Sequence, residues 1–166
     1  WFGFVTFAAF YFFFKDRNEF YKMAIFTIIG MTAFLIISTI WPNGHHLRLE
    51  EFPRDNIFTQ MVASLWKTDT PTNLWPSIHV YNSIAVHLAI AKSKHFVNRK
   101  GIRIASFVLA SSIILATVFI KQHSVFDVLT AFALSVIMYL VIYRNDLILA
   151  IRQSLHRDGH SRTQIG

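Results

Sequence analysis

Long apolar runs separated by short polar segments dominate the chain. The second of these runs reaches the roughly 20 residues of a straight transmembrane helix, and three others have about 16 to 18. Flanking aromatic residues and snorkelling Lys or Arg side chains extend the shorter ones. The pattern therefore predicts an all-α, polytopic transmembrane helical bundle with five visible spans. These spans are Trp1 to Phe14, Met23 to Pro42, Leu74 to Ala91, Ile104 to Ile120, and Val128 to Tyr143.

The first run is short for a span, and it begins on Trp1 without a preceding Met or charged segment. A secretory signal peptide is the alternative interpretation, but the run lacks the positively charged start and the small-residue cleavage site of such a peptide. We therefore expect that the N-terminus is truncated and that the complete protein has six spans.

The composition also indicates an integral membrane protein. Hydrophobic residues make up 54% of the 166 residues, and charged residues only 15%. The chain has no cysteine, which excludes disulfides, thiolate metal sites and cysteine nucleophiles. A net charge of +7 would suit nucleic acid, but the basic residues lie in short loops and form no continuous stripe. We therefore expect membrane lipids, and not nucleic acid, as partners.

The distribution of Lys and Arg predicts the orientation of the spans. Twelve of the 16 basic residues lie in segments 15–22, 92–103 and 144–166, and such segments usually face the cytoplasm. Loop 43–73, the start of the third run and the end of the fourth would then share the extracytoplasmic face. The chain is thus predicted to consist of a transmembrane domain, residues 1–143, and a basic cytoplasmic tail.

Two short motifs border the apolar runs on that predicted outer face. Pro76-Ser77-Ile78-His79 resembles the Pro-Ser-x-His motif of the type 2 phosphatidic acid phosphatase superfamily, and His123 with Asp127 resembles its His-x-x-x-Asp motif. Their order, their separation and their positions at helix ends are also similar to that family, from the second run to the fifth. The resemblance implies a membrane enzyme that acts on a lipid phosphate through a phosphohistidine.

Other positions depart from the family pattern. Arg48 corresponds to the Arg of the first motif, but Trp41 and Leu49 stand where the family has Lys and Pro. Ala116 and Thr117 stand where the third motif begins Ser-Arg. A Lys or polar residue in place of that Arg looks more like the branch that contains inositol phosphorylceramide synthase and its relatives. Lipid phosphotransfer therefore remains an alternative to hydrolysis.

The residue types of these motifs can supply the chemistry of phosphate ester hydrolysis. Asp127 lies one helical turn after His123 and can orient its imidazole, which makes that imidazole a competent nucleophile. A protonated His79 can act as the general acid for the departing oxygen. Because histidines and cationic side chains provide every catalytic element, this interpretation requires no metal and no cofactor.

Three residues are predicted to bind the phosphate of the substrate. Arg48 can hold two phosphate oxygens at once. Ser77, after Pro76, would begin a helix whose free N–H groups favour an anion. Lys121 adds a positive charge two residues before His123 and can compensate for the missing Arg.

Structural roles are the alternatives for each of these residues. His79 is then a hydrogen-bonded histidine in a helix interior, and Asp127 only an N-cap. Arg48 is then a solvated loop charge, and Lys121 a snorkelling membrane anchor. His87, on the same helix face as His79, either lines the pocket or fills a helix interface. In this case the chain is a transporter or a non-catalytic scaffold.

Overall fold

The computed structural model describes residues 1–44, 46–49, 52–72 and 74–144. The predicted cytoplasmic tail, 144–166, lies outside the described residues except for Arg144. Within the described residues the regular secondary structure is helical, as the apolar runs predict. The helices are α1 (Phe2–Lys15), α2 (Arg17–Ile40), α3 (Ile57–Thr68), α4 (Ile78–Lys92), η1 (Lys94–Phe96), α5 (Lys100–Phe119), α6 (Val125–Tyr139) and η2 (Leu140–Arg144).

Three of these helices are long and apolar enough to cross a membrane. They are α2, α5, and α6 together with its continuation η2. Helices α1 and α4 are shorter, with 14 and 15 residues. Three of the five predicted spans therefore have the length and composition of a membrane helix.

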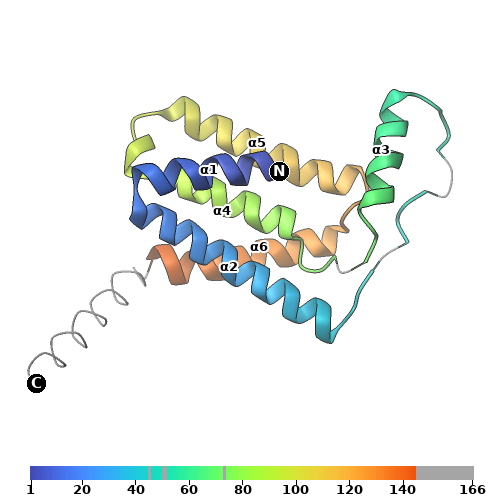
Figure 1. The fold of residues 1–166 in the computed structure, drawn as a ribbon, viewed down its shortest axis with the longest axis horizontal. Coiled ribbons are helices and arrows are strands. Elements are labelled where there is room, and N and C mark those ends of the chain that lie inside the picture. Colours follow the sequence, from blue (N-terminus) through green and yellow to red (C-terminus); the bar gives the residue numbers. More distant parts are fainter. Residues whose placement is uncertain (45, 50–51, 73, 145–166) are drawn as a thin grey trace, which may run out of the picture.

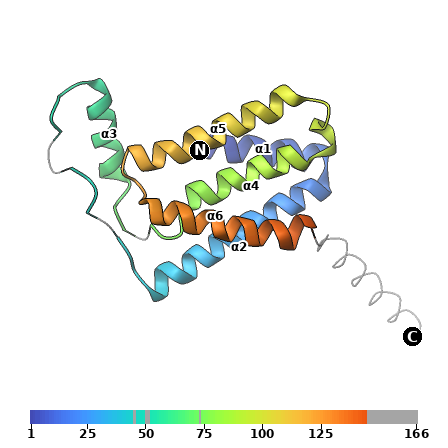
Figure 2. The same ribbon diagram turned by 180° about the vertical axis from the view of Figure 1, so that it is seen from behind.

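Helix α4 is the centre of the bundle. It contacts α1, α2, α5 and α6, whose axes lie roughly along its own although consecutive helices run in opposite directions (Figures 1 and 2). Small buried residues, Ser83, Ala85 and Ala89, allow the neighbouring helices to approach α4 closely. On the α5 side, Nδ1 of His87 lies 2.9 Å from Oγ of Ser106. His87 therefore fills a helix interface, which is one of its two predicted roles.

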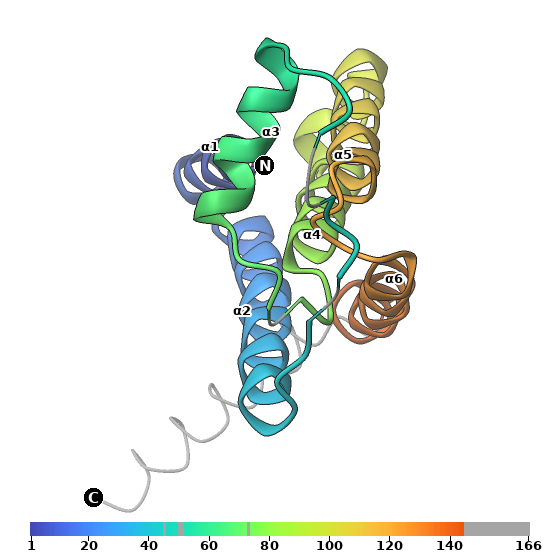
Figure 3. The same ribbon diagram turned by 90° about the vertical axis from the view of Figure 1, so that its right-hand side faces the viewer.

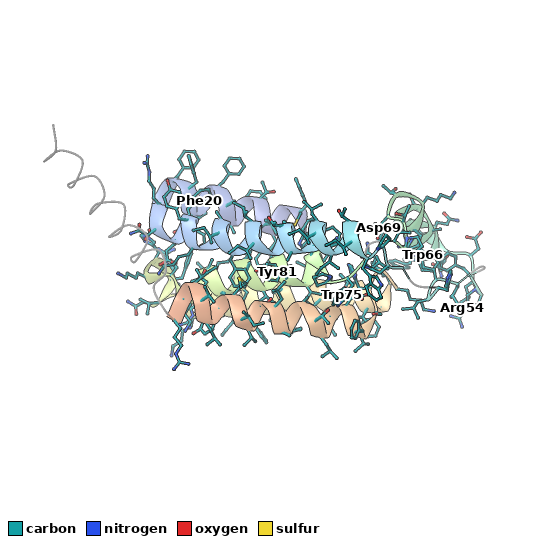
Figure 4. All side chains as sticks on the ribbon, turned by 90° about the horizontal axis from the view of Figure 1, so that it is seen from below. Phe20, Arg54, Trp66, Asp69, Trp75 and Tyr81 are labelled. Atoms are coloured by element: carbon teal, nitrogen blue, oxygen red, sulfur yellow. The ribbon has the colours of Figure 1, made fainter. Side chains whose placement is uncertain are left out.

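The contact between α2 and α4 depends on one glycine. Tyr81 of α4 is buried and donates a hydrogen bond of 2.9 Å from its hydroxyl to the carbonyl of Phe26 in α2. Gly30, one turn further along α2, faces the ring of Tyr81, and a Cβ atom at position 30 would overlap that ring. Figure 4 shows Tyr81 between the helices. The absence of a side chain at position 30 therefore allows the ring to pack.

Segment 43–73, which the sequence analysis treats as a loop, contains α3. An Asn56–Thr59 capping box begins this helix, and the chain before and after it meets in an isolated bridge between Gly44 and Thr72. Helix α3 lies across one end of the bundle and not along it (Figures 1 and 3). The interpretation of the whole segment as a loop was wrong. A capping box and an apolar stripe stabilise a helix here that is too short to be recognised as a transmembrane span.

Candidate active site

The start of α4 supplies the first histidine. Ser77 is fully buried and caps α4, with the N–H of Val80 3.4 Å from its Oγ. The backbone N–H of Ser77 also points at the carbonyl of Asp127, at 3.4 Å, which links α4 to α6. As predicted, Pro76 and Ser77 begin a helix. His79 consequently lies in its first turn, at the end of the bundle.

A tight turn after α5 supplies the second histidine. Lys121 has a positive φ of 55°, a left-handed conformation that few residues other than glycine adopt readily. The N–H groups of Gln122 and His123 then both donate to the carbonyl of Thr117, at 2.9 and 3.1 Å. This turn ends α5 and directs the buried His123 toward α4.

The carboxylate comes from the first turn of α6. Ser124 is the N-cap of that helix, and its backbone N–H donates to Oδ2 of Asp127 at 2.7 Å. In return the N–H of Asp127 donates to Oγ of Ser124 at 3.2 Å. The alternative in which Asp127 is itself the N-cap was therefore wrong. Its carboxylate is held by the capping box and still reaches the imidazole of His123.

The three side chains form a continuous row. Nδ1 of His79 lies 3.1 Å from Nε2 of His123, and Nδ1 of His123 lies 3.7 Å from Oδ2 of Asp127. A hydrogen bond between two imidazoles needs one donor and one acceptor nitrogen, so at most one ring of the pair is protonated on both nitrogens. The carboxylate faces Nδ1 of His123, which directs Nε2 of that ring toward His79. Such a row can act chemically as a nucleophile, a group that orients it and a proton donor.

Both histidines line a cavity of about 420 Å³ at the end of the bundle. Its wall combines apolar residues of α2 with hydroxyl groups and one carboxylate, and consists of Phe34, Leu35, Ser38, Thr39, Asp69, Thr70, Thr72, Leu74, Ile78, His79 and His123. A second cavity of about 430 Å³ is lined by Asp127 and Ser124. Leu74 lines both. The row of catalytic candidates is thus accessible from two cavities.

Arg48 does not line either cavity. Its guanidinium donates to the carbonyls of Trp66 and Asp69 and pairs with the Asp69 carboxylate at 3.3 Å, and the Arg48 side chain is only 11% exposed. The alternative of a solvated loop charge was therefore wrong. Gln122 also donates to Asp69, at 2.9 Å. Figure 4 shows Trp66 and Asp69 at the same end of the bundle. Arg48 thus reaches the cavity only through Asp69.

The two histidines and the carboxylate of the motifs lie together in the structure, but part of the cavity wall was not predicted. The motifs gave no indication of Asp69 or Gln122. The hydroxyl-rich stretch from Thr68 to Thr72 is the signal that could have indicated a polar wall. Lys121, predicted to bind phosphate, lies outside the lining of both cavities, so the described structure assigns it a backbone role.

We expect substitutions of Lys121 to separate that backbone role from its charge. Lys121→Gly should leave the free energy of unfolding unchanged or raised, because glycine adopts a positive φ without strain. Lys121→Val should lower it by about 1–2 kcal/mol, because a β-branched residue is strained there. Chemical denaturation in detergent measures both. An equal loss of stability in the two variants would contradict the turn as the reason for the residue.

No family model, curated protein or solved structure matches the chain. Among the described residues, no group of three or more His, Asp and Glu side chains is arranged to hold a metal ion. The case for a function therefore rests on the motifs and on the geometry of the cavity.

Proposed function

We propose that this protein is an integral membrane phosphatase that hydrolyses a lipid phosphate or pyrophosphate through a phosphohistidine on His123. The observation that carries the proposal is the row formed by His79, His123 and Asp127 at the wall of a cavity. Two segments supply these side chains, because His79 lies 44 positions before His123 and Asp127 follows His123 by four. Their meeting at one end of an apolar bundle suits a substrate whose head group lies at the membrane surface.

The first step transfers the phosphoryl group to the enzyme. The lone pair of Nε2 on His123 attacks phosphorus, and the bond between phosphorus and the lipid oxygen breaks. His79 gives its proton to that oxygen, which leaves as an alcohol, or as a phosphate monoester when the substrate is a pyrophosphate. Asp127 stabilises the positive charge that develops on His123. Because attack and departure are in line, the phosphoryl group must enter between the two imidazoles, and their contact of 3.1 Å must open.

The second step releases phosphate. Neutral His79 takes a proton from a water molecule, whose oxygen attacks phosphorus on the phosphohistidine. The bond between phosphorus and nitrogen breaks, and its electron pair returns to Nε2 of His123. Inorganic phosphate leaves, with His79 protonated for the next turnover. One histidine thus serves as acid and then as base.

Positive charge and N–H donors around the cavity would hold the phosphate. The first turn of α4, capped by Ser77, presents backbone N–H groups beside His79. The pairing of Arg48 with Asp69 offsets the negative charge of the carboxylate that lines the cavity. Lys121 adds to the positive potential at this end of the bundle.

The proposed topology has five spans with the site on the extracytoplasmic side. Helix α4 packs along the three longer helices, and α1 packs along α2 and α4, so both would cross the membrane with them. Basic residues gather at the opposite ends of the helices, in Lys15, Lys22, Lys92 and Lys100, and the positive-inside rule supports a cytoplasmic position for those ends.

Phosphate release by the detergent-purified protein tests the proposal. The substrates would be phosphatidic acid, phosphatidylglycerol phosphate, undecaprenyl pyrophosphate and lysolipid phosphates, each with EDTA present. We expect release from at least one of them that EDTA does not abolish, because the proposed chemistry uses no metal. The absence of release from all of them would contradict a phosphatase.

Lipid phosphotransfer is the second candidate, and the cavity beside Asp127 favours it because it leaves room for an acceptor. An alcohol would then replace water in the second step. Addition of inositol with a phospholipid donor should give a new phosphodiester and no inorganic phosphate. Inactivity in both assays would favour the transporter or scaffold.

A further inference from the structure

Helix α3 carries an exposed apolar stripe that no other part of the described chain covers. Ile57, Phe58, Met61 and Leu65 lie on one side of the helix, and the first three are exposed over about two thirds of their surface. No residue of α3 is buried. An exposed apolar stripe on an amphipathic helix is expected to contact another apolar surface. The position of α3 in the fold indicates what that surface is.

The positions of the tryptophans indicate where α3 lies relative to the membrane surface. All four are at the end of the bundle where the histidines meet. Trp1 packs against the ring of His79, Trp41 follows α2, Trp66 belongs to α3, and Trp75 stacks on Phe126. Tryptophan gathers at the boundary between lipid and water, where its ring is in apolar surroundings and its N–H in polar ones. This end of the bundle therefore has the composition of a membrane interface.

The orientation of α3 fits that boundary. It lies across the direction of the apolar helices at their ends, which is parallel to the surface of a membrane that those helices cross (Figure 3). At the same end the bundle exposes Ile40, Phe119 and Val125, each more than 60% accessible. Exposed apolar side chains thus occur both at the ends of the long helices and on α3. A lipid surface covers both at once.

We propose that α3 is an interfacial helix whose stripe of Ile57, Phe58, Met61 and Leu65 lies in the outer boundary of the bilayer. The C-terminal end of the helix is fixed to the bundle. Nε1 of Trp66 donates to the carbonyl of Ile120 at 2.8 Å, and Arg48 holds the carbonyls at the end of α3. The helix is therefore held in place from one end, with its stripe free to enter lipid. This inference does not depend on the proposed chemistry.

Fluorescent labels on single cysteines test the position of α3. Because the chain has no cysteine, each variant carries one label only. A label at Met61→Cys reports the surroundings of the stripe. The matched control is Gln60→Cys, because residue 60 is adjacent in the sequence but lies on the polar side of the same helix. Each variant would be labelled with an environment-sensitive dye and reconstituted into phosphatidylcholine–phosphatidylglycerol vesicles. Val108→Cys, exposed in the middle of α5, marks a label deep in lipid.

At position 61 we expect lipids with a spin label near the head group to quench the dye several-fold more than aqueous iodide does. At position 60 we expect iodide to quench the dye more than these lipids do. Equal quenching by iodide at both positions would place α3 in water and overturn the proposal. Protection of position 61 from both quenchers would mean that a protein surface, such as a second copy, covers the stripe, and would also overturn it. None of these results depends on catalytic activity, so the proposal and the proposed function can fail separately.

Discussion

His123→Ala should abolish turnover of every phosphate ester, whereas the loss in His79→Ala should depend on the leaving group. Without the imidazole at position 123 no phosphohistidine forms, and we expect a loss of roughly 10⁴-fold or more in kcat. Without His79 an alkoxide must leave unprotonated, which should reduce the rate of the first step with a lipid phosphate by about 10²- to 10⁴-fold. With p-nitrophenyl phosphate, whose leaving group needs no proton, His79→Ala should still release a rapid burst of nitrophenol.

Stopped-flow absorbance measures that burst, and its size should match the amount of enzyme because phosphohistidine accumulates when His79 no longer activates water. Asn82→Ala, in the same helix and outside the lining of the cavity, is the control for a general disturbance of α4. If His79→Ala abolished the burst while His123→Ala retained it, the two roles would have to be exchanged. Loss of the burst in both variants would leave the nucleophile unassigned.

Gly30→Ala should lower the free energy of unfolding by about 1–3 kcal/mol, although alanine is the better helix former. A Cβ atom at position 30 would overlap the ring of Tyr81, which is buried and held by its hydrogen bond to the carbonyl of Phe26. The cost is that of overpacking in a core that cannot expand. Denaturation in detergent, followed by circular dichroism, measures it.

Gly101→Ala is the matched control, because position 101 is also helical but a Cβ atom there meets no atom within 4 Å. That variant should be neutral or slightly more stable, by up to about 1 kcal/mol, from the helix propensity of alanine. Similar changes in both variants would show that α2 and α4 are not in close contact at Gly30.

The apolar pattern predicted the number and the order of the bundle helices well, and their lengths less well. Hydropathy does not show that Ser77 is the N-cap of α4. The apolar run therefore begins at Leu74, whereas the helix begins only at Ile78. Helix α3 escaped prediction because its stripe is short, and its start depends on an Asn56 capping box that hydropathy cannot detect.

The histidine row was predictable because its spacing carries the information. Four positions separate His123 from Asp127, which keeps the two side chains together although His123 lies in the turn before α6 and not in the helix. Basic residues at the other ends of the predicted spans indicated one face for both motifs. The pairing of Arg48 with Asp69 was not predictable. Asp69 follows Arg48 by 21 positions, and only the fold of the chain between them brings the two side chains together.

The close packing of Gly30 against Tyr81 also has an evolutionary consequence. Neither position can change alone without either a clash or an unfilled space, so the two positions should vary together. In a homologue that carries a side chain at position 30, we expect a smaller residue at position 81 and the loss of the hydroxyl that now binds the carbonyl of Phe26. Covariation of positions 30 and 81 among homologues would then show whether the close spacing between α2 and α4 is retained.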